Sequence, residues 1–113
     1  MSGKIDWSSL STAATKAAAA KAELQSTFEA QVQTHLDDAA KASGYDNIMT
    51  AVSYAEEPAV TKFQSDGLAF RAWRSKVWAY VYQALTEVNA GTRETPTVEA
   101  FIAELPPLEA AAT

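Results

Sequence analysis

Two arginines beside a pair of tryptophans are the residues of this sequence best suited to bind an anion. Arg71 and Arg74 could hold a carboxylate or a phosphate between them as a fork, because each guanidinium presents several donors in one plane. The structural alternative is that an arginine next to Trp73 and Trp78 stacks on an aromatic ring or covers the aromatic cluster. The sequence leaves both interpretations open.

The carboxylates and the histidine offer no catalytic arrangement. Asp37 and Asp38 are adjacent, as are Glu56 and Glu57, and sequence neighbours point to different sides of a helix, which makes them poor candidates for a shared proton site. His35 is the only histidine. Because no second ligand stands at a suitable spacing, we predict a solvated helical histidine and no metal site.

Motifs for other kinds of chemistry do not occur in the sequence. There is no glycine-rich phosphate loop after a strand and no serine in a nucleophile-elbow pattern. The chain has no cysteine, which excludes a disulfide framework and thiolate chemistry. We therefore predict that the protein is not an enzyme and binds no cofactor.

The composition is that of an acidic chain with one domain. Its 113 residues carry a formal net charge of −5 and contain no basic tract, so nucleic-acid binding is not expected. The N-terminal sequence has no apolar core long enough for a signal peptide. The Ala-rich run is short and is interrupted by Lys16 and Lys21, so we predict no membrane span.

A long amphipathic helix is predicted over residues 57–91. Its apolar residues recur in steps of three, four and seven, as on one face of a helix. Pro58 suits the first turn, and Gly91 suits a C-cap. Gly67 indicates a kink, a break between two helices, or a close approach of a neighbouring backbone. The apolar face comprises Phe63, Phe70, Val77, Val81, Leu85 and Val88, widened by Trp73 and Tyr80.

The two tryptophans of this helix are expected to serve the core and an interface rather than a ligand cage. Trp73 and Trp78 are five positions apart, or about 140° around a helix of 3.6 residues per turn, so both cannot point into one narrow core. We expect one to pack on the short helix and the other on the N-terminal or C-terminal helix or on a partner. Trp73, Val77 and Val81 share the richest apolar face, and we expect them to be buried.

A second strong helix is predicted over residues 12–43. Its first part is nearly all residues of high helix propensity, and Leu24, Phe28, Val32 and Leu36 then recur every four residues. A surface of alanines lets another helix come close, so we predict that residues 12–36 mediate self-association or docking to a partner helix. The alternative is a solvent-exposed helix that alanine alone stabilises.

The N-terminal residues 1–11 are predicted to form an arm. Trp7 is its largest apolar side chain. It either packs on the helical body, as large apolar groups commonly do, or anchors the arm in a partner chain, because tryptophan is enriched at interface hot spots.

Two short helices complete the prediction. Gly44 ends the Ala-rich helix, and Asp46 caps a short helix over residues 47–54. Thr95 caps a last helix, in which Pro96 takes the first position. Val98, Phe101, Ile102 and Leu105 form its apolar face, Pro106 and Pro107 stop it, and residues 109–113 form a tail.

Five short elements occur in order between residues 44 and 108: a Gly-Tyr-Asp start, a Ser-Tyr-Ala turn, a Phe-Gln element, a Trp-Arg-x-x-Val-Trp core from Trp73 to Trp78, and a Pro-Thr-x-Glu-x-x-x-x-x-Leu-Pro ending. In this combination the chain resembles a small helical domain of unknown biochemical function found in tailed bacteriophages and prophages. The resemblance covers more than half of the chain. The resemblance implies a role in the phage tail or tail fibre, either as a structural component or as an assembly factor. It implies no catalytic residue in this chain. The family often has an acidic residue where this chain has Ser75, so a salt bridge at that position is not expected here.

The sequence thus predicts an all-α protein with a compact domain over residues 44–108 and a helix over residues 12–43 that packs on it or projects as an oligomerisation stalk. We expect a non-enzymatic phage tail or tail-fibre-associated structural protein that acts through protein–protein contacts, located in the virion tail and, during assembly, in the host cytoplasm. The alternative is a tail-fibre assembly chaperone or adaptor that the virion does not retain. Expected partners are a tail-fibre or other tail protein, or further copies of the chain, but no nucleic acid and no membrane. The residues assigned to the core or to an interface are Trp7, Leu24, Phe28, Val32, Phe63, Phe70, Trp73, Arg74, Val77, Trp78, Val81, Leu85 and Phe101.

Overall fold

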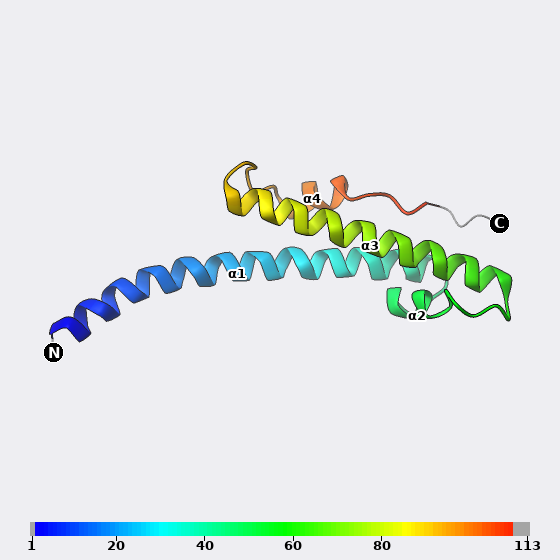
Figure 1. The fold of residues 1–113 in the computed structure, drawn as a ribbon, viewed down its shortest axis with the longest axis horizontal. Helices are drawn as coiled ribbons and strands as arrows, with labels where there is room; N and C mark the ends of the chain where they lie inside the picture. The colour runs from blue at the N-terminus through cyan, green and yellow to red at the C-terminus, as the bar shows by residue number, and fades with distance from the viewer. Residues whose placement is uncertain (1, 110–113) are drawn as a thin grey trace. The chain divides into compact units, whose positions relative to one another are not determined.

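All of the regular secondary structure in the described part of the chain is helical. The structure, a computed structural model, describes the backbone of residues 2–109 and the side chains of Lys16 and residues 18–109. Four helices occur in this part: α1 (Ser2–Ala42), α2 (Ile48–Ser53), α3 (Thr61–Ala90) and α4 (Val98–Glu104), and no strand accompanies them (Figure 1). The predicted all-α class and the order of a long, a short, a long and a short helix are confirmed.

The chain divides into two compact units, Met1–Gln31 and Val32–Thr113. The first unit is helical from Ser2 onward, so the predicted arm and the Ala-rich segment belong to one helix. Adding a residue to an existing helix costs far less free energy than nucleating a new helix. The helix of the Ala-rich segment can therefore extend through the polar residues that precede it. The side chain of Trp7 and most of the predicted tail lie outside the described residues.

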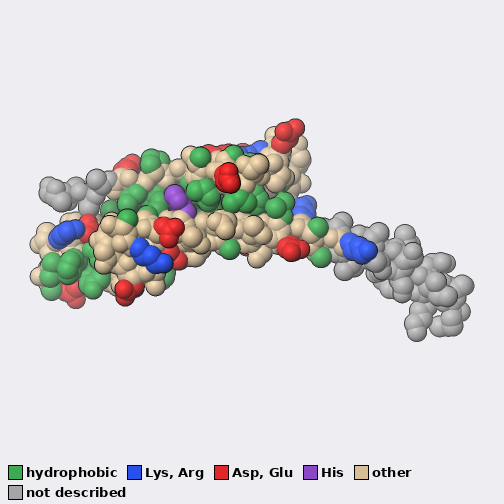
Figure 2. All heavy atoms as spheres, turned by 180° about the vertical axis from the view of Figure 1, so that it is seen from behind, with side chains coloured by type: hydrophobic (Ala, Val, Ile, Leu, Met, Phe, Trp, Pro, Cys, Tyr) green, Lys and Arg blue, Asp and Glu red, His purple; other side chains and the backbone are tan. Residues whose placement is uncertain are grey.

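The second unit includes the last turns of α1. Val32, Leu36 and Ala40 recur every four residues and are 0% exposed, so α1 gives one apolar stripe to the core. Figure 2 shows hydrophobic side chains gathered along the line where α3 faces this part of α1. The unit therefore begins at Val32, whereas the compact domain was expected to begin at residue 44. The other buried apolar residues are Ile48, Ala51, Ala55, Phe70, Trp73, Val77, Val81, Ala84, Phe101 and Leu105.

Gly67 marks a close approach of two backbones. A Cβ atom built on it would lie 2.5 Å from the amide nitrogen of Ala55, 2.8 Å from the carbonyl carbon of Tyr54 and 2.9 Å from the carbonyl oxygen of Ala51. Helix α3 runs through this position without interruption. Of the three predicted meanings of Gly67, the structure thus supports the close approach, here by the C-terminal end of α2.

The first residues of α2 and α3 differ from the predicted ones because local side-chain hydrogen bonds determine where these two helices begin. Asn47, not Asp46, caps α2 by accepting from the amide of Thr50 at 2.9 Å. Helix α3 begins at Thr61, because the Glu57 carboxylate accepts from the amide of Ala59 at 3.0 Å and closes a turn that competes with the helix.

The predicted start of the last helix is also wrong. Thr97, not Thr95, caps α4, and its hydroxyl accepts from the amide of Ala100 at 3.2 Å.

The glycines that follow the C-terminal ends of α1 and α3 were predicted correctly. Gly44 (φ 96°) follows α1 and Gly91 (φ 77°) ends α3, both in the left-handed conformation that suits glycine.

A polar cluster joins α4 to α3. Arg93 donates through Nη2 to both carboxylate oxygens of Glu104 at 2.6 Å, and the Tyr80 hydroxyl donates to the same carboxylate. The Arg93 guanidinium also lies 5.6 Å from the centre of the Phe101 ring, a cation–π contact. These hydrogen bonds hold the pKa of Glu104 below its usual value, with Arg93 as the largest cause and Tyr80 next.

The depressed pKa of Glu104 predicts a pH-dependent contribution to stability. A carboxyl whose folded pKa is lowered stabilises the fold fully above its unfolded pKa, and loses that contribution as the pH falls through the folded pKa. We expect wild type to exceed Glu104→Gln in urea midpoint at pH 7, and the difference to shrink below about pH 4. Glu94→Gln, at an exposed position nearby, is the control. A difference that stays constant across this range would contradict the assignment.

Candidate functional site

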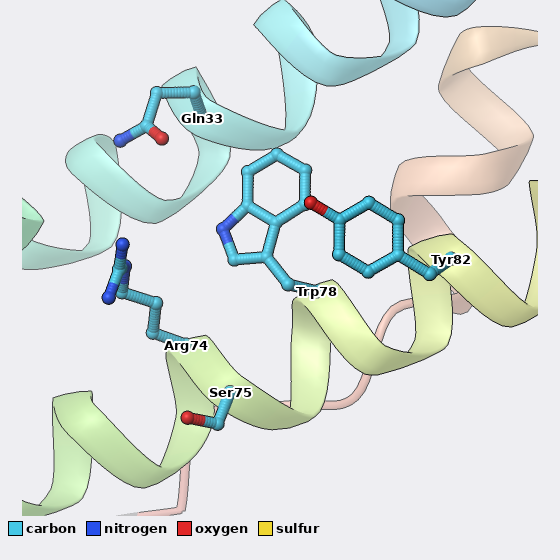
Figure 3. A pocket seen from close by; sticks show the side chains of 5 residues that line it. All are labelled: Gln33, Arg74, Ser75, Trp78 and Tyr82. Atoms are coloured by element: carbon cyan, nitrogen blue, oxygen red, sulfur yellow. The ribbon is translucent and has the colours of Figure 1, made fainter.

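A pocket with a volume of about 350 Å³ lies on the second unit, between α3 and the last part of α1. Gln33 enters it from α1, and Arg74, Ser75, Trp78 and Tyr82 enter it from α3 (Figure 3). A charged group and aromatic rings meet in this pocket, which opens to solvent. It is therefore the candidate functional site.

Helix geometry explains why these side chains meet. Arg74, Trp78 and Tyr82 are four positions apart in turn, so they follow one another along a single face of α3. That face lies next to the buried stripe of α3 that includes Trp73, Val77 and Val81. Figure 3 shows Arg74 and Trp78 extending from α3 toward α1, and Tyr82 lying along α3 with its hydroxyl toward the Trp78 ring. Opposite them, the Gln33 amide nitrogen donates to the Asp37 carboxylate at 3.2 Å, which ties its side chain along α1.

Arg74 is the unusual group of this pocket. Its Nε atom is buried and has no hydrogen-bond partner, and within the described part of the chain the guanidinium forms no ion pair. A buried donor left unpaired costs about 1–3 kcal/mol. The other two arginines differ, because Arg71 lies 3.6 Å from a Glu56 carboxylate oxygen and Arg93 binds Glu104.

The predicted fork of two arginines is not formed. Arg71 is exposed, faces Glu56 and does not line the pocket. The reason is that the loop before α3 brings a carboxylate to Arg71, which the sequence pattern could not indicate. Arg74 alone is directed at the pocket.

The two tryptophans occupy different environments, as their spacing predicted. Trp73 is 4% exposed and donates from its indole nitrogen to the carbonyl of Pro106 at 2.7 Å. Its ring lies 5.7 Å from that of His35 in an edge-on arrangement. Trp78 is half-buried in the pocket wall, with its ring centre 6.1 Å from that of Tyr82.

Trp73 contacts α1 through the His35 ring and the segment after α4 through the Pro106 carbonyl. The expected packing of one tryptophan on the short helix α2 stays a prediction. The expectation of a solvated histidine is wrong, because His35 is half-buried against Trp73. This difference arises because the last turns of α1 take part in the core, whereas the compact domain was expected to begin at residue 44.

The remaining residues assigned to the core or an interface fall into three groups. Val32, Phe70, Val77, Val81 and Phe101 are buried, whereas Phe28 and Leu85 are half-buried. Leu24 and Phe63 are exposed, at 45% and 39%, so they are not core residues. Their assignment to an interface stays a prediction.

A second pocket, of about 230 Å³, is lined by residues that include Tyr45, Tyr54, Lys62 and Phe63. Its Tyr45 hydroxyl and Lys62 ammonium already have a partner, because both donate to Asp66 at 2.8 Å. Burial and, next, the hydrogen bond to Asp66 raise the pKa of Tyr45 to about 12. These contacts join the loop after α1 to α3, which is a structural role.

Three residues of the candidate site, Gln33, Ser75 and Tyr82, were not among the site residues predicted from the sequence. Tyr82 continues the four-residue spacing of Arg74 and Trp78, and that spacing is the signal that could have found it. Gln33 carries no such signal, because only the packing of α1 against α3 brings it to the pocket. Within the described residues, no group of histidine, aspartate and glutamate side chains is placed to hold a metal ion.

Comparisons with protein-family models, with curated proteins and with solved structures gave no match. The resemblance to the phage domain therefore rests on the sequence elements between residues 44 and 108 alone. In the part of the chain that the structure describes, no helix has both the length and the apolar character needed to cross a membrane.

Proposed function

We propose that this protein is a non-enzymatic structural component of a bacteriophage tail or tail fibre, and that it acts by binding other helices through α1. The observation that carries the proposal is the exposure of α1 in the first unit, where residues 18–27 are all exposed. Leu24 lies in this segment with 45% of its surface exposed. A long helix that presents alanines and a leucine to solvent is suited to close packing against another helix.

The phage assignment is supported by the sequence elements from Gly44 to Pro106 and by the helical character of that region. Mass spectrometry of purified phage particles tests it, because a structural component is present at a stoichiometric level. A protein that is absent from the particle but bound to the tail-fibre protein in infected cells would instead be the assembly chaperone or adaptor. A protein found in neither place would contradict both roles.

Leu24→Gln is expected to weaken self-association of the full chain. Removing one leucine from a helix–helix interface costs about 1.5–3 kcal/mol of apolar burial, so the association constant should fall by about tenfold to hundredfold. Sedimentation velocity over a concentration series measures this. Leu68→Gln is the matched control, because Leu68 on α3 is exposed to a similar degree, 43%. An equal effect of both substitutions would mean that Leu24 has no special part in association.

A further inference from the structure

We propose that the pocket lined by Arg74 and Trp78 binds a carboxylate, and that this carboxylate is an aspartate or glutamate side chain of the bound protein. The inference rests on the proposed function in one respect only, namely that the chain binds another protein. The proposed contact between a partner carboxylate and this pocket lies on the second unit and is separate from the exposed segment of α1.

The pocket offers donors that lack acceptors. The Arg74 guanidinium and the Trp78 indole nitrogen can only donate, and within the described residues neither donates to a protein acceptor. Among the described residues, no aspartate or glutamate lines the pocket. Figure 3 shows the guanidinium extending toward α1 and the nitrogen edge of the indole turned to the side of Arg74. A ligand that accepts hydrogen bonds and carries negative charge complements this arrangement.

A carboxylate fits better than a phosphate. A guanidinium binds a planar carboxylate through two parallel hydrogen bonds, whereas a phosphate dianion is best held by more than one cation. Of the described residues that line the pocket, Arg74 alone is cationic. The rings of Trp78 and Tyr82 can cover the methylene groups of an acidic side chain. The volume of about 350 Å³ admits a side chain of this size.

The test is a titration of the full chain, labelled with ¹⁵N, with N-acetyl-glutamic acid α-methylamide. This probe carries one carboxylate on a neutral peptide-like frame. We expect saturable shifts of the Arg74 Nε–H and Trp78 indole N–H resonances, assigned with Arg74→Gln and Trp78→Phe. The dissociation constant should rise about tenfold or more in Arg74→Gln, since the charge-assisted pair is lost. Arg71→Gln, three positions away in α3 and outside the pocket, should leave binding unchanged.

Three results would overturn the inference. Sodium chloride at equal ionic strength could reproduce the shifts, inorganic phosphate could bind more tightly than the probe, or Arg71→Gln could weaken binding as much as Arg74→Gln. The correct fold of each variant is checked by its amide spectrum. If the pocket does not bind the probe, the expected effect of Leu24→Gln on self-association still holds. Failure of this inference is therefore distinguishable from failure of the proposed function.

Discussion

Replacing Trp73 with alanine will lower the free energy of unfolding by about 3–5 kcal/mol, the range for removing a large aromatic side chain from a core. Trp73 is 4% exposed, packs edge-on against His35 and Phe70, and bonds to the Pro106 carbonyl. The substitution thus leaves a cavity between α1 and α3 and removes the hydrogen bond that holds the segment after α4. Chemical denaturation at pH 7 measures the loss.

Two further variants show how much of the stability lost in Trp73→Ala comes from the indole hydrogen bond and how much from the buried apolar volume. Trp73→Phe keeps most of the apolar volume but removes the indole donor, so it should cost less than the alanine variant while leaving the Pro106 carbonyl without its partner. Tyr82→Ala, at a position that is 59% exposed, should change stability by about 0.5 kcal/mol or less. If Trp73→Ala were as mild as Tyr82→Ala, the core could not be centred on this face of α3.

Gly67→Ala will destabilise the protein by about 1–3 kcal/mol, the cost of overpacking a well-filled site. The added methyl group would lie 2.5 Å from the Ala55 nitrogen and within 3 Å of two more backbone atoms at the end of α2. Backbone atoms held in a helix end cannot move aside as a flexible side chain can. Helices α2 and α3 must therefore separate.

The sign of this effect makes the test decisive. In an exposed helix interior, changing glycine to alanine stabilises by about 1 kcal/mol because alanine has the higher helix propensity. A thermal or urea melt of Gly67→Ala that shows higher stability would mean that α2 does not approach α3 at this point. Ser75→Ala, at an exposed position of the same helix, is a control for helix propensity alone.

The features that follow from periodicity could be predicted from the sequence. Val77 and Val81 are buried because a 3.6-residue repeat places them on one face of α3, and Gly91 ends that helix because glycine accepts a positive φ. The starts of the helices could not be predicted in the same way. The turn at Glu57 and the cap at Asn47 each depend on one side-chain hydrogen bond that competes with equally plausible neighbours.

The candidate site could be predicted only in part. Arg74 and Trp78 were recognisable as a charged and an aromatic residue on neighbouring turns of one helix. That Arg74 lacks a carboxylate partner while Arg71 faces Glu56 depends on how the loop before α3 folds. That Gln33 completes the pocket depends on the packing of α1 into the second unit, and no local pattern in the sequence encodes that pairing.

Light scattering on two chains tests most directly whether the exposed segment of α1 is a contact surface. One is the full chain of 12.1 kDa; the other starts at Glu29, so that it keeps Val32, Leu36 and Ala40 in the core. The full chain should show a mass that rises above that of one copy with increasing concentration, whereas the shorter chain should keep the mass of one copy while retaining its helical spectrum. A folded full chain that stays at the mass of one copy up to high micromolar concentration would contradict self-association through α1.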